Sequence, residues 1–434
     1  MDLVLLIILF IIFFFIILSY SKSNLDFVAI SLLCCFIAAS MTFVVIGTDI
    51  NDFISFIEWP AIIIILSMSL ITKIAQDSNI LEFVAVKLFK FSRGDQRIFF
   101  WLLCLITIFL AAIISDMVVV LILAPIVVRL CHFLKIRSGT YLLGMTICIN
   151  IGSIITPFSS GENIIISTAF NLDTLYFIQH YWIFSFLLIF ATIFLLDRYW
   201  LRKEPKIEDL QKKFVIDLID TDIMVKNKKM FYFNSIAILI TIILFGILPI
   251  LYLTAAISAL ILVLVNKNYT KKSMSDLLRD IEWEIIFFFI SLYVVVGCLI
   301  EAGFAEIFSK IPFETINPFL LSFLLLIIIS LISGFVANTP TALIFIPIIE
   351  TLIDPNIHGF SPVPILFAFI IGINLGGNFI PQGAAADMMT LKIARDSGVD
   401  NLNYKRLLKM GALFAFIHIG IAMISLLIII PLFG

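Results

Sequence analysis

Residues 374–387 read NLGGNFIPQGAAAD and interrupt an apolar run that extends from 362 to 392. An earlier stretch, NIGSIITPFSSGEN at 150–163, interrupts the run 140–170 in the same way. Glycine and proline weaken a helix, because glycine is conformationally free and proline lacks a backbone N–H. We therefore predict two broken helices, whose unpaired backbone groups survive at membrane depth only where protein or water satisfies them.

A constant sequence offset relates the two halves of the chain. Composition alone explains repeated Ile and Leu, but not Trp, Pro and Gly residues that recur in the same order. We therefore predict two repeats. The matched pairs are, at an offset of 224, Ile57-Glu58-Trp59 with Ile281-Glu282-Trp283, Asn150 with Asn374, Gly152 with Gly376, Pro157 with Pro381 and Asn163 with Asp387, and, at 222, Asp116 with Asn338 and Pro125 with Pro347.

The composition is that of a membrane protein. Of the 434 residues, 62% are hydrophobic and 13% are charged, whereas a soluble domain carries about 25% charged residues. The net charge of −2 gives no reason to expect a nucleic-acid partner. The six cysteines form no CxxC pair and the four histidines are scattered, so we expect no cofactor, no metal cluster and no enzymatic centre.

Two apolar runs are too long for one crossing, since a spanning helix needs about 20 residues. The runs 98–134 and 318–350 have polar midpoints, Ser115-Asp116 and Asn338-Thr339-Pro340-Thr341. We predict that each forms a re-entrant hairpin. The remaining predicted spans are 2–20, 25–47, 54–76, 181–197, 231–247, 249–265, 283–301 and 411–433.

The polar segment 201–230 divides these elements into two equal sets. We predict an all-α polytopic membrane protein made of two inverted repeats. Residues 1–200 form the first transmembrane repeat, 201–230 a cytoplasmic linker and 231–434 the second, inverted repeat. Each repeat has five crossings, one re-entrant hairpin and one broken helix.

Positive charge orients this arrangement, because Lys and Arg are enriched in cytoplasmic loops. If each hairpin returns to the side from which it entered, each half crosses an odd number of times, and the second repeat is inverted. With the linker in the cytoplasm, all of the 28 Lys and Arg residues except Lys310 lie on the cytoplasmic side. We therefore predict a multi-pass protein of the cell (plasma) membrane, with both termini outside and the central linker in the cytoplasm.

Three acids fall at the predicted tips and breaks, namely Asp116, Glu162 and Asp387, and no Lys or Arg accompanies them. Inverted repeats with broken helices are typical of secondary transporters, which bind substrate and coupling ions near the midplane of the membrane. An acid at a helix centre costs roughly 2.5–3.5 kcal/mol on insertion scales, which favours a functional role; a helix cap is the alternative for Asp116 and Asp387. We predict that Asp116 and Asp387 bind the coupling cation, Na⁺ or H⁺, and we expect no other metal.

Neutral polar side chains and glycines around these acids complete the predicted substrate- and ion-binding site. Hydroxyl and amide groups add neutral ligands, and glycine permits backbone turns and close approach. The full predicted set is Ser115, Asp116, Asn150, Gly152, Thr156, Glu162, Asn163, Asn338, Thr339, Thr341, Asn374, Gly376, Asn378, Gly383 and Asp387.

These residues resemble the motifs of the ion transporter superfamily, which includes arsenite efflux pumps, sodium/proton antiporters, the melanosomal P protein and citrate or dicarboxylate carriers. Gly376-Gly377-Asn378 followed by GAAAD at 383–387 resembles GGN-x-x-x-x-GASAN, and 150–163 resembles NIGG-x-x-TPIG-x-x-x-N. The tip at 338–341 resembles both the DNxP tip of the arsenite and P-protein branch and the SNT tip of the dicarboxylate branch. The resemblance implies a homodimer with a scaffold and a moving transport part.

The chain departs from these motifs at its acids. The family's Asp-Asn pair at the hairpin tip reads Ser115-Asp116 in the first repeat and Ala337-Asn338 in the second. SGE at 160–162 replaces Asp-Pro-Pro, and Asp387 replaces the final Asn of the second break. These changes redistribute the acids, so the family's coupling scheme does not transfer intact.

Together, these features predict an ion-coupled secondary active transporter that works by alternating access and is not an enzyme. Three acids without a basic residue near them favour a small inorganic ion, carried by Na⁺/H⁺ antiport or arsenite efflux. A citrate- or dicarboxylate-type organic anion is the alternative substrate class. An ion channel with the same inverted repeats is the alternative from another class. The expected partners are the lipid bilayer and a small ion or anion.

Overall fold

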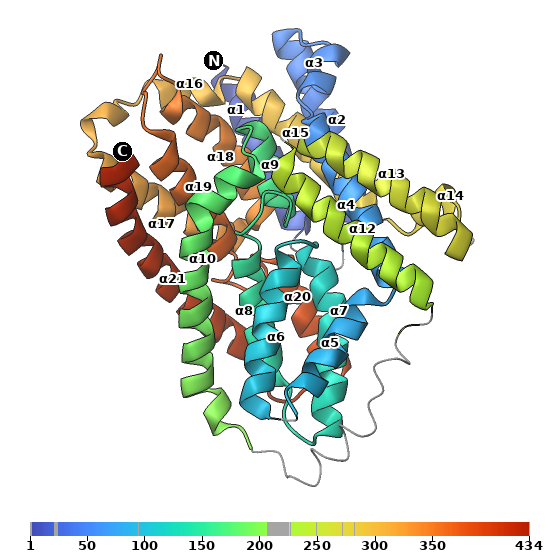
Figure 1. Ribbon diagram of the computed structural model, residues 1–434. Helices are drawn as coiled ribbons and strands as arrows, with labels where there is room; N and C mark the ends of the chain where they lie inside the picture. The colour runs from blue at the N-terminus through green and yellow to red at the C-terminus, as the bar shows by residue number, and fades with distance from the viewer. Residues whose placement is uncertain are drawn as a thin grey trace.

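The computed structural model describes residues 2–20, 25–93, 95–205, 225, 227–248, 250–270, 272–281 and 283–433, and these residues form helices and no strands (Figure 1). The helices of the first half are α1 (Leu3–Tyr20), α2 (Phe27–Ile46), α3 (Ile50–Ser55), α4 (Trp59–Asp77), α5 (Ile80–Phe91), α6 (Gln96–Ala111), α7 (Asp116–Phe133), α8 (Gly139–Gly152), α9 (Gly161–Ala169), α10 (Thr174–Tyr199) and the 3₁₀ turn η1 (Leu201–Lys203). Those of the second half are α12 (Lys228–Ile247), α13 (Leu251–Thr270), α14 (Met274–Arg279), α15 (Trp283–Glu301), α16 (Phe304–Ser309), η3 (Phe313–Thr315), α17 (Pro318–Val336), α18 (Asn338–Ile353), α19 (Pro362–Gly376), α20 (Ala385–Asp396) and α21 (Tyr404–Phe433).

The helices of the two halves correspond at the offset that the sequence predicts. α3 and α14 begin at Ile50 and Met274, and α4 and α15 begin at Trp59 and Trp283, so each pair is separated by 224 residues. Within the described residues, nine helices are long and apolar enough to cross a membrane. The predicted all-α polytopic fold is therefore confirmed.

The predicted hairpins and broken helices are present. The run 98–134 is the pair α6 and α7, and 318–350 is the pair α17 and α18. The run 140–170 divides into α8 and α9, and 362–392 divides into α19 and α20. The predicted linker 201–230 lies largely in 206–224, outside the described residues, so the domain boundaries placed beside it stay predictions.

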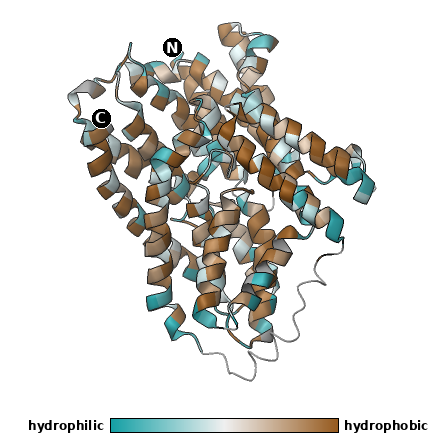
Figure 2. Cartoon of the chain, viewed as in Figure 1, coloured by the Kyte–Doolittle hydropathy of each residue, from teal (hydrophilic) through white to brown (hydrophobic). Residues whose placement is uncertain are grey.

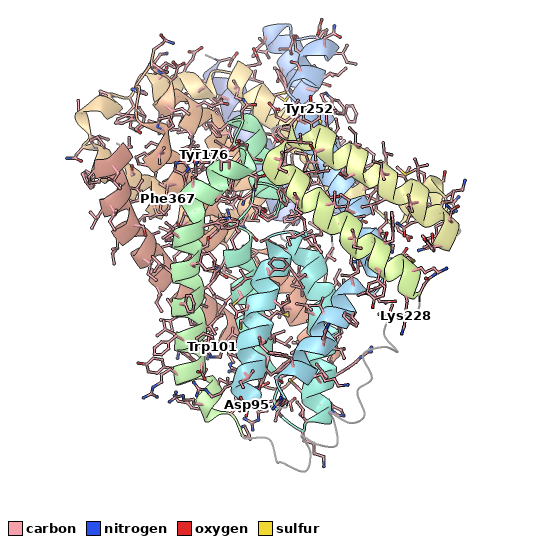
Figure 3. All side chains as sticks on the ribbon, in the orientation of Figure 1. Asp95, Trp101, Tyr176, Lys228, Tyr252 and Phe367 are labelled. Atoms are coloured by element: carbon pink, nitrogen blue, oxygen red, sulfur yellow. The ribbon has the colours of Figure 1, made fainter. Side chains whose placement is uncertain are left out.

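The two hairpins enter the molecule from opposite ends. In Figure 1, α6, α7 and α8 occupy the lower half, whereas α17, α18 and α19 occupy the upper half. The lower ends of α6, α7 and α10 are hydrophilic in Figure 2. Figure 3 places Asp95, at the base of the first hairpin, at the lower end, and Tyr176 and Phe367 in the upper half. This opposed arrangement is that of an inverted repeat.

Around the hairpins, helices of the first half pack against helices of the second half. α2 packs against α15, and the corresponding pair, α13 and α4, packs in the same way. Small side chains line the contact face of α2, which allows the two backbones to approach closely. The buried residues of α2 are Ser31, Cys34, Cys35, Ala38 and Thr42.

Equivalent glycines allow each broken helix to pack closely against the first arm of its own hairpin. A Cβ built on Gly152 would lie 2.7 Å from the carbonyl oxygen of Ile108 in α6. A Cβ built on Gly376 would lie 2.4 Å from the carbonyl oxygen of Ser330 in α17. No side chain fits at either position, so these two glycines set the distance between tip and break in each half.

Candidate functional site

The tip of the first hairpin lies against the first break. Asp116 is the first residue of α7, and Ser153 directly follows α8. The Ser153 hydroxyl contacts both carboxylate oxygens of Asp116, Oδ1 at 2.8 Å and Oδ2 at 2.9 Å. A carboxylate offers about four lone-pair sites and one hydroxyl supplies one proton, so Asp116 keeps free acceptor capacity.

The loop of the first break is closed by side chains that bond to backbone. The amide nitrogen of Asn163 donates to the carbonyl oxygens of Ser153 and, at 3.2 Å, of Thr156. The Thr156 hydroxyl donates to the carbonyl oxygen of Ala112, beside the hairpin tip, at 2.6 Å. These bonds satisfy carbonyl groups that the broken helix and the end of α6 leave free.

The tip of the second hairpin is a single residue, Ala337, whose φ of 84° is in the left-handed region that is costly for a residue with a Cβ. This turn places Asn338 at the first position of α18. The Ser333 hydroxyl donates to Asn338 Oδ1 at 2.7 Å, and Asn338 Nδ2 donates to Glu162 Oε1 at 3.0 Å. The second tip therefore meets an acid that belongs to the first half.

The helices that follow the two breaks cross between the halves. α9 packs against α18 of the second hairpin, and α20 packs against α7 of the first. Each hairpin tip therefore contacts the break of its own half. It also contacts the helix that follows the break in the other half.

Amide pairs connect the two broken helices. Asn150 Nδ2 donates to Asn378 Oδ1 at 2.7 Å, and Asn374 Nδ2 donates to Asn163 Oδ1 at 2.8 Å. Asn374 Oδ1 and Asn378 Nδ2 are buried and have no hydrogen-bond partner within the described residues. A buried amide atom without a partner is costly, which makes this polar seam a place where a further ligand, such as water, would be stabilised.

Asp387, in the first turn of α20, bonds to α8 and does not face the cavity between the tips. Its side chain is 1% exposed, and its Oδ1 accepts a hydrogen bond of 2.5 Å from the Thr146 hydroxyl of α8. Asp387 does not line the cavity that contains Asp116 and Glu162. The structure therefore separates the predicted acids into two that face the cavity and one that is buried behind it.

A cavity of about 160 Å³ lies between the two tips. Its polar wall is made by the tips and by the segments that follow the breaks. The remaining wall is mainly apolar and comes from α1, α4 and α15, with Tyr20 and Ser69 as its hydroxyl-bearing residues. The predicted site residues that line it are Ser115, Asp116, Glu162, Asn338, Thr339 and Gly383, and the apolar wall includes Tyr20, Ile65, Met68, Phe288 and Phe289.

Four helices begin at this cavity, namely α7, α9, α18 and α20, and residues at or beside each first turn line it. A helix N-terminus carries about half a positive charge, so four of them offset roughly two negative charges. The two carboxylates supply that amount when both are ionised. No Lys or Arg is among the described residues that line the cavity.

A larger cleft of about 1190 Å³ adjoins the cavity and shares five lining residues with it, namely Tyr20, Met117, Ile285, Ala337 and Ala385. Lys392 and Arg395 of α20 line this cleft, and both belong to the set predicted to lie on the cytoplasmic side. The cavity between the tips is therefore reached from the end of the molecule where the basic residues gather.

The remaining predicted site residues support the cavity from behind. Thr341 donates to the carbonyl oxygen of Ala337 at 2.7 Å, which secures the second tip. Gly152 and Gly376 provide the close helix contacts already described. The apolar wall was not identified from the sequence, because Met68 and Phe288 sit in spans where lipid-facing and cavity-facing residues have the same character.

Comparison with known proteins gives three findings. Residues 4–372 match the model of the CitMHS family, described as a citrate transporter. An uncharacterised transporter of Mycobacterium tuberculosis is 24% identical over 87% of this chain and 88% of its own length, and the human P protein is 22% identical over 90% of this chain and 56% of its own length. The YdaH transporter of Alcanivorax borkumensis has a similar fold, with a TM-score of 0.60 at 12% identity over 88% of this chain and 87% of that one.

The family match spans most of the chain, including the first hairpin, the first break and the second hairpin, and ends within α19. The relatives that name an activity are transporters, which confirms the expectation that this chain is not an enzyme. The chain belongs to the CitMHS family and is a membrane transporter.

Proposed function

We propose that this protein is an ion-coupled secondary active transporter of a small inorganic ion, with Na⁺ or H⁺ as the coupling ion. The observation that carries the proposal is the cavity between the tips, which presents Asp116 and Glu162 and, among the described lining residues, no basic side chain. Two carboxylates in a confined space favour a cation or protons over a bare anion. Na⁺/H⁺ antiport fits this requirement directly, and arsenite efflux fits it when arsenite moves as its neutral acid, As(OH)₃.

Alternating access is the mechanism that the surroundings of the cavity favour. The polar wall comes from hairpins and broken helices that pack on one another, and the apolar wall comes from α1, α4 and α15. Apart from Tyr20 and Ser69, the described side chains of that wall are apolar, so few hydrogen bonds have to break when the polar part slides along it. Movement of the hairpins relative to that wall would carry the cavity from one side of the membrane to the other.

A citrate-type organic anion is the second candidate substrate. Two observations favour it: four helix N-termini surround the cavity, and the family model is that of a citrate transporter. Helix N-termini bind carboxylates. Because the cavity also holds two acids, such an anion would enter together with cations that neutralise its charge or that of the acids.

Transport by purified protein in proteoliposomes tests these assignments. Na⁺ and H⁺ gradients are imposed separately, and fluxes of H⁺, Na⁺, arsenite and radiolabelled citrate are measured. Gradient-driven Na⁺/H⁺ exchange or arsenite movement is expected. Asp116→Asn keeps an acceptor for Ser153 but removes the charge, so we expect coupled flux to fall about tenfold or more, since a charge-assisted hydrogen bond contributes about 1.5–3 kcal/mol.

The matched control is Glu306→Gln, an exposed acid of α16 that pairs with Lys310 at 3.6 Å. It should keep the flux of the wild type. Accumulation of citrate, with no exchange of inorganic ions alone, would replace the first candidate by the second. Flux without counterflow and without coupling to a second ion would identify a channel and overturn the proposal.

The orientation of the chain and its assembly belong to the same proposal. We place both termini outside and the linker on the cytoplasmic side of the plasma membrane, because this orientation puts all of the 28 Lys and Arg residues except Lys310 on the cytoplasmic side. The resemblance to the ion transporter superfamily supports a homodimer. The mass of the protein in detergent, measured by light scattering, tests that assembly.

A further inference from the structure

The two hairpin tips are equivalent in position but differ in charge. Asp116 and Asn338 are related by the offset of 222 and each begins the second arm of its hairpin. The first tip has its own carboxylate, and the second has an amide in the same place. The backbones of the two tips are therefore equivalent, but only the first tip has an acidic residue at this position.

Glu162 supplies the carboxylate that the second tip lacks. It lies in the first turn of α9, is 6% exposed, and accepts a hydrogen bond from Asn338 at 3.0 Å. The residue that corresponds to Glu162 in the second half is Ala386, which lines the cavity on the side of the first tip. Each tip thus has one acid beside it, and both acids come from the first half of the chain.

The surroundings of the two acids are also alike. Each stands in the first turn of a helix, where the helix dipole stabilises negative charge. Each is bonded to neutral side chains, Asp116 to Ser153, and Glu162 to Asn338 and Ser160. Both line the same cavity, and among the described residues that line it the other titratable side chain is Tyr20.

We propose that Glu162 does for the second hairpin what Asp116 does for the first, so that the cavity holds two cation-binding carboxylates, one at each tip. The inference rests on the proposed ion-coupled transport and extends it, because it assigns the second coupling charge to a residue that reaches its hairpin from the opposite half. A cation at either tip would be bound by a carboxylate together with hydroxyl or backbone oxygens.

Relocation of the acid tests this assignment. Glu162→Gln keeps an acceptor for Asn338 Nδ2, so it removes the charge and leaves the hydrogen bond. Glu162→Gln combined with Asn338→Asp moves the carboxylate to the hairpin, the position that Asp116 occupies in the first half. In that double variant the glutamine amide donates to the aspartate, and Ser333 still donates to residue 338, so the same contacts persist with the donor reversed.

The readout is the melting temperature of the purified full-length protein as a function of cation concentration. One series varies NaCl against choline chloride at constant ionic strength, and a second varies H⁺. At saturation the slope against the logarithm of the concentration is proportional to the number of cations that the folded state binds in excess of the unfolded state. We expect Glu162→Gln and Asp116→Asn each to halve the wild-type slope, and the double variant to restore it.

Glu306→Gln should leave the slope unchanged. A wild-type slope in Glu162→Gln would overturn the inference and leave Glu162 as a hydrogen-bond acceptor only, while the effect of Asp116→Asn would still support coupled transport. A double variant that folds, judged by size-exclusion chromatography, but keeps the halved slope would also overturn it. A wild type whose melting responds to neither cation would overturn the proposed function itself, and this inference with it.

Discussion

Lys73 of α4 forms an ion pair with Asp280 at 3.1 Å, and this contact joins the first half of the chain to the second. The positions that correspond to them by the offset of 224 are Gly297 and Phe56. These two also touch, since a Cβ on Gly297 would lie 2.2 Å from Phe56 Cγ. Equivalent positions of the two halves thus touch in two places. On the side where basic residues gather the contact is an ion pair, and on the opposite side it is an aromatic ring packed on a glycine.

Cysteine labelling tests whether these two sides face opposite faces of the membrane. Arg137→Cys lies after the first hairpin and Asn356→Cys after the second, and both positions are exposed. An impermeant maleimide applied to intact cells should label position 356, and position 137 should react only after the membrane is opened. The six native cysteines are buried, so the wild type should give little background.

Labelling of both positions from the same side would contradict the inversion. Labelling of position 137 alone from outside would keep the inversion but reverse the predicted orientation, and would move the termini to the cytoplasm.

A second contact between the halves makes stability depend on pH. Lys272 Nζ donates to Asp77 at 2.7 Å, and this hydrogen bond raises the pKa of Lys272. The stabilisation is fully present below the pKa of an unfolded lysine, about 10.4, and is lost as pH rises through the higher folded value. Because the pair is partly exposed, Lys272→Met should cost about 0.2–1 kcal/mol at neutral pH.

Melting temperature in detergent, followed from neutral to strongly alkaline pH, measures this effect. The difference between wild type and Lys272→Met should shrink above the pKa of lysine. Lys310→Met removes the exposed pair with Glu306 and should change little at any pH. A constant difference across the series would show that Lys272 acts through packing instead of charge.

The close contact of α19 with α17 makes Gly376 intolerant of a side chain. In Gly376→Ala the Cβ would meet backbone atoms of Ser330 at 2.4 and 2.7 Å, which cannot move without displacing α17. We expect a loss of about 1–3 kcal/mol in stability. Gly420→Ala in α21 is the matched control, because beyond its own helix turn no atom of the described residues lies within 4 Å of its Cβ. Equal melting temperatures for the two variants would refute this account.

Asp387 is the predicted cation ligand that the structure places behind the cavity. Asp387→Asn can still accept the bond from Thr146, so a fall of about tenfold or more in coupled transport would show that its charge takes part. Thr146→Val removes the bond and keeps the carboxylate. Wild-type coupling in Asp387→Asn, measured in the same proteoliposomes, would leave Asp387 as a structural partner of α8.

The sequence was sufficient for the spans, the hairpins and the breaks, because polar midpoints and recurring Gly and Pro mark them directly. The prediction that Asp116 and Asn338 lie at the hairpin tips is also confirmed, since they are the first residues of α7 and α18. The short helices α3 and α14 were missed, although each begins with a capping box, Asp49 with Asp52 and Ser273 with Asp276.

Two features could not be read from one sequence. A repeat offset relates equivalent residues, but it does not say whether a break meets its own hairpin or that of the other half, so the pairing of Glu162 with Asn338 was hidden. The sequence also did not show toward which neighbouring helix the side chain of Asp387 points. Successive residues of a helix are rotated by about 100°, and in the first turn of α20 this turns Ala385 and Ala386 to the cavity and Asp387 to α8.

α9 packs against the hairpin of the second half and α20 against the hairpin of the first, and this exchange has a consequence for the evolution of such proteins. Since each hairpin is completed by a helix of the other half, a single copy of the repeat holds no whole site. A protein with one copy would complete such a site only as a dimer of two chains inserted in opposite orientations. Duplication and fusion of such a segment would fix that pairing within one polypeptide and let the two copies diverge. In this chain the first half holds both acids of the cavity, and Glu162 bonds to Asn338 of the second half.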